Sequence, residues 1–191
     1  LRARGYTVTP FTSGAPANDF IAAAKANDLV FISETIGSTT VVEGGAAGKF
    51  ILRDVNVPII SNEAYMFDNA DWVKRTDDGS NDFVNWGNTG RSEVDAIGLG
   101  EARNSLYIRK ADHPIAKGLP AGKVQVYDGL YSFNFGVPSS DADVIASIEA
   151  DGSYPTLFVY EKGDKLTDGS VVPNKRIGFF LGQAANPTAN W

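Results

Sequence analysis

The sequence predicts an α/β domain with a mainly parallel central sheet and a β-rich, partly antiparallel C-terminal half. Leu29–Ser33 and Val57–Ser61 are short, continuous apolar runs, the pattern of strands that are covered on both faces. Segments with helical character separate the predicted strands, and such alternation is typical of right-handed βαβ units. After residue 103 the apolar residues recur with a period of two, which favours strands in an antiparallel arrangement.

The first quarter of the chain supplies the predicted βαβ pattern. A strand is expected at Tyr6–Phe11, followed by a helix over Ala17–Lys25 whose apolar residues share one face. Asn18 or Asp19 is placed to cap that helix. A second helix is expected over Thr39–Leu52 despite three internal glycines.

The C-terminal half is predicted to consist of strands joined by loops. Gly163–Asn174, which contains an Asp-Gly pair, is expected to be the hairpin loop between the last two strands. The expected strands are Ser105–Arg109, Lys123–Tyr127, Asp143–Glu149, Thr156–Glu161 and Lys175–Leu181.

Between the two halves, residues 66–103 are polar and glycine-rich with three large aromatic residues interspersed. We interpret this segment as an insertion on the rim of the domain, because Trp72, Phe83 and Trp86 need a surface to pack against. The alternating aromatic residues from Tyr127 to Phe135 are best explained by core packing, with a sugar-stacking platform as the alternative.

Composition narrows the function classes. The 191 residues are enough for a single domain over 1–191, and the absence of cysteine excludes thiol nucleophiles, disulfides and Cys-ligated metals. A net charge of −6, with basic residues clustered only in pairs, argues against nucleic acid as a partner. No apolar run approaches the roughly 20 residues that span a bilayer, so membrane insertion is not expected. No motif indicates a cofactor, and none is predicted.

Two further expectations concern the context of the chain. Because the sequence opens on Leu1 and closes on Trp191 without a terminal helix, we expect a fragment of a longer polypeptide. Its acidic composition, lack of cysteine and Asn/Asp/Gly-rich loops favour an extracellular or periplasmic location, in other words a secreted parent protein.

Four segments carry a resemblance to a known family. They are Asp28-Leu-Val-Phe-Ile-Ser-Glu34, Val57-Pro-Ile-Ile-Ser-Asn-Glu63, Ala111-Asp-His-Pro-Ile-Ala-Lys-Gly-Leu119 and Arg176-Ile-Gly-Phe-Phe-Leu181. In this order and spacing the chain resembles class I glutamine amidotransferase-like domains, most closely the trehalose-utilisation (ThuA-like) branch. The resemblance implies a flavodoxin-like three-layer sandwich whose first strand precedes Leu1 and whose last helix is missing.

The resemblance also implies where a catalytic site would lie. Active family members carry a cysteine at the strand-to-helix elbow, which here corresponds to Asn62-Glu63-Ala64. Since no cysteine is present, the chain is expected to lack glutaminase chemistry and to be a pseudoenzyme. A carbohydrate-related ligand is what the ThuA-like resemblance suggests.

Polar residues follow both apolar strands of the first half. In a parallel sheet the ligand site lies beyond the carboxyl ends of the strands, so Ser33, Glu34 and Thr35 are expected to meet Asn62 and Glu63. Glu34 and Glu63 would then form a carboxylate pair able to share a proton, hold a cation or bond a sugar. The alternative is that both glutamates cap the helices that follow them.

His113 is the only histidine of the chain. As a catalytic base it would need a nucleophile such as Ser33 and an orienting acid, Asp112 or Asp128. The simpler interpretation is a turn formed by His113-Pro114 with the imidazole bonded to backbone. One histidine rules out a multi-histidine metal centre.

Asp77, Asp78 and Asp82 form an acidic loop that is a weak candidate for Ca²⁺. The loop does not match the EF-hand spacing, so a solvated loop is favoured and no metal is predicted.

The sequence therefore favours a non-catalytic amidotransferase-like binding or structural module of a larger exported protein, contacting a carbohydrate or small polar ligand and other domains of the parent chain. The alternative is a hydrolase or isomerase of a sugar or small polar metabolite, using Glu34 and Glu63 or Ser33 and His113. A third hypothesis is a protein–protein interaction domain in a surface assembly, with Trp72–Trp86 at the contact.

Overall fold

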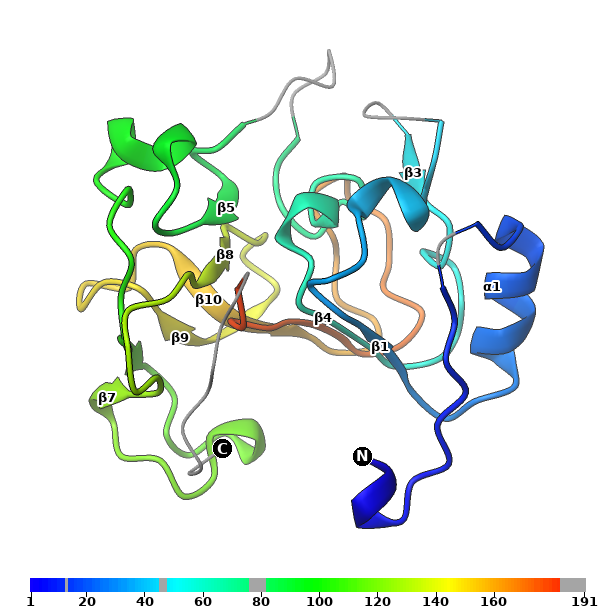
Figure 1. Cartoon of the computed structure of the whole chain (residues 1–191), viewed down its shortest axis with the longest axis horizontal. Coiled ribbons are helices and arrows are strands. Elements are labelled where there is room, and N and C mark those ends of the chain that lie inside the picture. Colours follow the sequence, from blue (N-terminus) through cyan, green and yellow to red (C-terminus); the bar gives the residue numbers. More distant parts are fainter. Residues whose placement is uncertain (13, 45–47, 76–81, 183–191) are drawn as a thin grey trace.

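The computed structural model describes residues 1–12, 14–44, 48–75 and 82–182. A seven-stranded sheet in the order β1-β4-β11-β10-β9-β6-β7 crosses the middle of the molecule (Figure 1). Its strands are β1 (Val30–Ile32), β4 (Ile59–Ser61), β6 (Ser105–Ile108), β7 (Gly122–Gln125), β9 (Asp143–Ser147), β10 (Pro155–Tyr160) and β11 (Arg176–Gly178).

Two short antiparallel ribbons and few helices complete the described fold. The ribbons pair β2 (Val42–Glu43) with β3 (Lys49–Phe50), and β5 (Trp86–Asn88) with β8 (Asn134–Gly136). The helices are α1 (Ala17–Lys25) and the 3-10 turns η1 (Arg2–Arg4), η2 (Ser38–Thr40), η3 (Ala64–Met66), η4 (Ser92–Ile97) and η5 (Pro114–Ala116).

The prediction of a mainly parallel sheet is wrong. Only β1 with β4 and β4 with β11 pair in parallel, whereas the four remaining pairs of the large sheet are antiparallel. Three of the antiparallel pairs join consecutive strands, β6 with β7, β9 with β10 and β10 with β11, so the chain reverses direction between them. The prediction of a β-rich, partly antiparallel C-terminal half is confirmed.

The prediction of a three-layer flavodoxin-like sandwich is also wrong. Among the described residues α1 is the only α-helix, and it lies beside the β1 end of the sheet (Figure 1). Most of the sheet is covered by loops, 3-10 turns and the β5–β8 ribbon instead of helices. The described part of the fold is therefore a mixed, mainly-β arrangement.

The prediction of a helix over Ala17–Lys25 is confirmed with the same bounds. Phe20 and Ala24 are buried on its inner face. Pro16 occupies the N-cap position and no side chain caps the helix, so the expected cap by Asn18 or Asp19 is wrong. Proline is tolerated at this extended position because the first N–H groups of a helix have no partner within the helix, so its missing donor costs nothing.

Two other expectations for the first half are wrong. Tyr6–Phe11 is not a strand, since it pairs with no described strand. Thr39–Leu52 is not a helix: its described residues form part of η2 and the β2–β3 ribbon, with residues 45–47 outside the described range. The glycines of this segment weaken a helix, and Val41, Val42 and Phe50 are buried in the extended arrangement.

The core has two parts, one on each face of the large sheet. Alternate residues of β10 enter different clusters: Phe158 and Tyr160 belong to the cluster that also contains residues of α1, whereas Leu157 and Val159 belong to the other. The aromatic run that begins at Tyr127 lies in the second cluster, with three of its rings fully buried. The core interpretation of that run is confirmed, and the buried rings cannot serve as a sugar platform.

The segment 66–103 contributes to the interior. Trp72 and Trp86 are each 1% exposed, and Trp86 lies on β5 beside the ring of Phe83, with 5.1 Å between ring centroids. The aromatic residues of this segment therefore pack against the domain, as expected. This packing fixes β5 next to the ends of β1 and β4.

Two features hold the C-terminal strands in place. The hairpin over Gly163–Asn174 is confirmed, because β10 and β11 are antiparallel and Lys165 bridges Val171 within the loop. Arg176 is 1% exposed and forms no ion pair with a described carboxylate; its guanidinium donates to backbone carbonyls. These carbonyls belong to Arg53, Val55, Val57, Asn174 and Lys175. The arginine thus anchors the loop that leads into β4.

Candidate functional site

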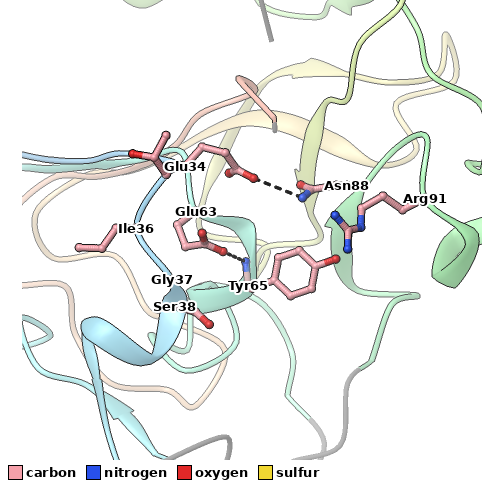
Figure 2. A pocket seen from close by; sticks show the side chains of 9 residues that line it. Glu34, Ile36, Gly37, Ser38, Glu63, Tyr65, Asn88 and Arg91 are labelled. Atoms are coloured by element: carbon pink, nitrogen blue, oxygen red, sulfur yellow. Dashed lines mark hydrogen bonds between the residues drawn. The ribbon is translucent and has the colours of Figure 1, made fainter. Parts of the chain in front are cut away.

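The candidate site lies where β1 and β4 end. The two strands are parallel neighbours, with Ile32 opposite Ser61, so the residues that follow them emerge at the same edge of the sheet. Glu34 follows β1 and Glu63 follows β4, and Figure 2 shows both side chains at one pocket. The prediction that these strand ends are neighbours is confirmed.

The pocket has a volume of about 350 Å³. Its walls come from three regions that are distant in sequence: the loop from β1 into η2, the β4–η3 turn, and the segment from β5 to η4. The lining residues are Glu34, Thr35, Ile36, Gly37, Ser38, Glu63, Tyr65, Asn88 and Arg91.

Glu34 is held by amide side chains and not by a helix end. Asn88 donates to its Oε1 over 3.5 Å, and Asn134 donates to its Oε2 over 3.4 Å. Burial, together with the nearby charge of Glu63, raises the pKa of Glu34 to about 8, although the two amide bonds oppose the shift. The capping alternative therefore does not describe Glu34.

Glu63 does cap the turn that follows it. Its Oε1 accepts from the backbone N–H of Tyr65 over 2.9 Å, at the start of η3. Burial nevertheless raises the pKa of Glu63 to about 7, because one backbone bond does not offset the loss of water around the carboxylate. The capping alternative therefore holds for this one glutamate, whose second oxygen is still directed at the pocket region.

The opposite wall carries a fixed phenol and guanidinium. The Tyr65 hydroxyl donates to Glu93 Oε1 over 2.5 Å, and Arg91 Nε donates to the same oxygen over 2.6 Å. The Arg91 guanidinium lies 5.8 Å from the centre of the Tyr65 ring, and Trp86 packs against that ring with 5.1 Å between centroids. Glu93 thus orients both groups at the mouth of the pocket.

Behind the pocket lies a small group of buried amides. Asn62, Asn88 and Asn134 are 5%, 1% and 0% exposed. The Asn134 side-chain nitrogen donates to the backbone carbonyl of Asn62 and to that of Leu181, the latter over 2.9 Å. The side-chain oxygens of all three asparagines have no hydrogen-bond partner among the described residues. Such oxygens are uncommon in protein interiors.

The other residues expected at the strand ends differ in their distance from the pocket surface. Thr35 lines the pocket, and its hydroxyl bonds the hydroxyl of Ser33 over 3.0 Å. Ser33 does not line the pocket. Asn62 lies beneath the pocket as part of the amide group just described.

His113 is not brought to Ser33. It precedes η5, after β6, and four strands separate β6 from β1 in the sheet. Because β6 runs opposite to β1, their carboxyl ends also lie at opposite edges of the sheet. The His113 Nδ1 accepts from the backbone N–H of Ile115 over 3.3 Å, in agreement with the turn interpretation.

The acidic loop offers no described cation site. Asp77 and Asp78 lie outside the described residues, and Asp82 accepts from the side chain of Asn85 over 2.5 Å. Within the described ranges no group of three or more His, Cys, Asp or Glu residues could hold a metal ion. None of the helices formed by these residues has the length and apolarity needed to cross a membrane.

Sequence reasoning missed Tyr65, Asn88 and Arg91 of the pocket lining and Asn134 behind it, besides the loop residues 36–38. Tyr65 lies two residues beyond Glu63 and follows from the strand-end argument once the turn is placed. Asn88 and Arg91 come from a segment without periodicity, and Asn134 comes from a strand 100 residues beyond its partner Glu34. No sequence signal points to these three.

Comparisons with known proteins support the fold. No protein-family model matches the sequence, and a search of curated proteins finds no match either. The chain is similar in structure to "Cytoplasmic Protein STM1381 from Salmonella typhimurium LT2", with 13% identity and a TM-score of 0.51 over 90% of this chain and 66% of that one. It also matches "Cytoplasmic Protein STM3548 from Salmonella typhimurium", with 14% identity and a TM-score of 0.45 over 85% and 63%.

The chain thus spans slightly less than two thirds of the length of these two proteins. At this level of identity the first likeness shows a shared fold and no shared activity. Fold and pocket together define a mixed, mainly-β protein with a carboxylate-lined pocket at one edge of its sheet.

Proposed function

We propose that the chain is a binding module whose pocket at the ends of β1 and β4 takes a small polar ligand. The observation that carries this proposal is the pair of carboxyl groups of Glu34 and Glu63 at one pocket. Neither forms an ion pair with a described residue, whereas Arg91 is paired with Glu93. Two unpaired acids at one pocket favour a site that interacts with a ligand over a site that only stabilises the fold.

The energetic argument supports the same proposal. Burial raises the pKa of both glutamates, which means that their ionised forms are destabilised by the fold. Groups that disfavour stability concentrate at sites where function needs them. A cap for η3 would be supplied equally well by an uncharged residue such as Asn or Ser.

The test is ligand binding followed by thermal unfolding and calorimetry. A library of small polar compounds is screened against the wild type, and hits are repeated on Glu34→Gln and Glu63→Gln. We expect each substitution to weaken binding by roughly tenfold or more, because a carboxylate is exchanged for a neutral amide. Glu101→Gln, an exposed glutamate that does not line the pocket, is the matched control. Hits that bind all four proteins equally would contradict the proposal.

A second candidate function is acid–base catalysis by the same pair. The observation that favours it is the pKa of about 8 for Glu34 and about 7 for Glu63, close to the values that general acids and bases need at neutral pH. The substrate class is a sugar or a small polar metabolite. A hydrolase screen should then yield an activity that falls by roughly 100-fold or more in either glutamine variant. An activity kept by both variants would exclude this role.

The wider context is part of the proposal. The amidotransferase-like origin is supported by the parallel β1, β4 and β11 and by a site at their carboxyl ends. The carbohydrate ligand and the exported parent protein rest on the sequence alone, and both similar structures are titled cytoplasmic proteins. A protein contact through Trp72–Trp86 has little support, because both tryptophans are buried.

A further inference from the structure

Three side chains bring hydrogen-bond acceptors to the pocket. Glu34 and Glu63 contribute two carboxyl groups from adjacent strand ends. Asn88, 1% exposed, lies on β5 with its amide group facing Glu34, and its side-chain oxygen has no partner among the described residues. Figure 2 shows this amide directed toward the glutamates. A buried acceptor without a donor calls for a group that binds oxygen.

The donors around the pocket are engaged elsewhere or bond weakly. The Tyr65 hydroxyl and Arg91 Nε both donate to Glu93. The amide nitrogens of Asn88 and Asn134 reach Glu34 only at 3.5 and 3.4 Å, near the outer limit of a hydrogen bond. Glu34 therefore receives only long hydrogen bonds, and Glu63 is bonded through one of its oxygens, by the backbone N–H of Tyr65.

The charged groups of the pocket also favour a positively charged ligand. Arg91 is paired with Glu93 at the mouth of the pocket, with 2.6 Å between Nε and Oε1. The remaining charged groups of the lining are Glu34 and Glu63, which repel each other. A neutral polyol would supply donors but no compensating charge, whereas a cation supplies both attraction to the carboxylates and a partner for the amide oxygen.

We propose, as a deepening of the binding function proposed above, that this pocket recognises a positively charged group through Glu34, Glu63 and the side-chain oxygen of Asn88. The lining contains no histidine or cysteine, and oxygen ligands alone suit hard cations such as Ca²⁺ and Mg²⁺. The ammonium group of a small organic molecule presents the same positive charge with N–H donors. The shared chemistry is a cation, and the two sources are separated by experiment.

The experiment is isothermal titration calorimetry of the whole chain with a small panel at constant ionic strength. The metal arm uses CaCl₂, MgCl₂ and MnCl₂, the ammonium arm uses ethanolamine and putrescine in the presence of EDTA, and the neutral arm uses glucose and glycerol. Glu63→Gln, Glu34→Gln and Asn88→Ala are titrated beside the wild type, with Glu101→Gln as the control. Circular dichroism checks that each variant is folded.

We expect saturable binding in one cationic arm, weakened roughly tenfold or more by either glutamine variant and to a smaller degree by Asn88→Ala. Glu101→Gln should bind as the wild type does. Binding in the neutral arm only, with the same dependence on Glu34 and Glu63, would overturn the cation inference and leave the binding function standing. Cation binding that is equally strong in the wild type and in both glutamine variants would also overturn the cation inference. Binding in no arm, from a folded wild type, would overturn the cation inference.

Discussion

At the scale of single residues, the site depends on two glutamates that the fold makes reluctant to ionise. Glu34 is bonded by two asparagine side chains and Glu63 by one backbone N–H, and both are largely removed from water. A pair of carboxyl groups in such a position binds protons more tightly than it would in the unfolded chain. Stability and the proposed ligand binding therefore depend on the same two residues.

This linkage predicts how stability depends on pH. The pKa values of Glu34 and Glu63 are raised from 4.5 to about 8 and about 7, so the native state holds more protons than the unfolded state between these limits. Their contribution to stability is fully present below pH 4.5 and is lost as the pH rises through 7 to 8. We expect the free energy of unfolding to fall by on the order of 2 kcal/mol between pH 5 and pH 8.

The double variant Glu34→Gln, Glu63→Gln isolates this effect. Gln cannot ionise, so the double variant should lose most of this pH dependence and be more stable than the wild type at pH 8. Urea unfolding at pH 5, 6.5 and 8 measures both proteins. Parallel pH profiles for the two proteins would show that the glutamates are not the source of the slope.

At the scale of elements, the sheet is held together by a close approach of two strands. Gly178 on β11 lies opposite Phe158 on β10, and a Cβ atom at Gly178 would come within 2.2 Å of the Phe158 ring. That ring is fully buried and packs edge-on against Phe67, which follows η3. The glycine therefore allows the antiparallel half of the sheet to pack beneath the turn that carries Glu63.

We expect Gly178→Ala to destabilise the protein by about 2 kcal/mol or more, because the buried ring has no space into which to move. Gly37→Ala is the matched control, since a Cβ atom there meets nothing closer than the Thr39 hydroxyl at 3.8 Å. Urea unfolding of both variants measures the difference. Equal stability of the two variants would mean that β10 and β11 adjust more readily than close packing implies.

At the scale of the whole molecule, the sheet is unevenly covered. The β5–β8 ribbon packs on β10, whereas β1 and β7 are the edge strands of the sheet, with no described strand on their outer sides. Phe31 on β1 is 47% exposed and the preceding Leu29 is 45% exposed. An edge strand with exposed apolar side chains is a site of self-association.

We therefore expect the protein to self-associate with rising concentration and Phe31→Lys to reduce this association. A charge on an edge strand opposes pairing with a second strand. Light scattering over a concentration series provides the measurement. Leu130→Lys, at a 68% exposed position outside the sheet, is the control and should leave association unchanged. An equal reduction by both variants would point to net charge as the cause.

The sequence by itself determined the local features of this protein. Ala17–Lys25 carries a helical apolar face, and the runs that became β1 and β4 are apolar enough to be strands in any fold. Glu34 and Glu63, the acidic residues that come after these two strands, were therefore expected at one edge of the sheet, and they line one pocket. Such features depend on residues close in the chain, where periodicity and turn chemistry act directly.

Only the tertiary structure decided the features that depend on distant partners. Thr39–Leu52 became 3-10 turn and ribbon because its apolar residues found a core surface in the extended form. The pairing of β10 with β11, and not a further parallel strand, made the sheet mixed. Asn134 reached Glu34 across 100 residues of chain, and the burial that raises the pKa of that carboxyl was likewise set by packing. Long-range pairing leaves no periodic trace in a sequence, because it depends on which surfaces remain free once the local elements have formed.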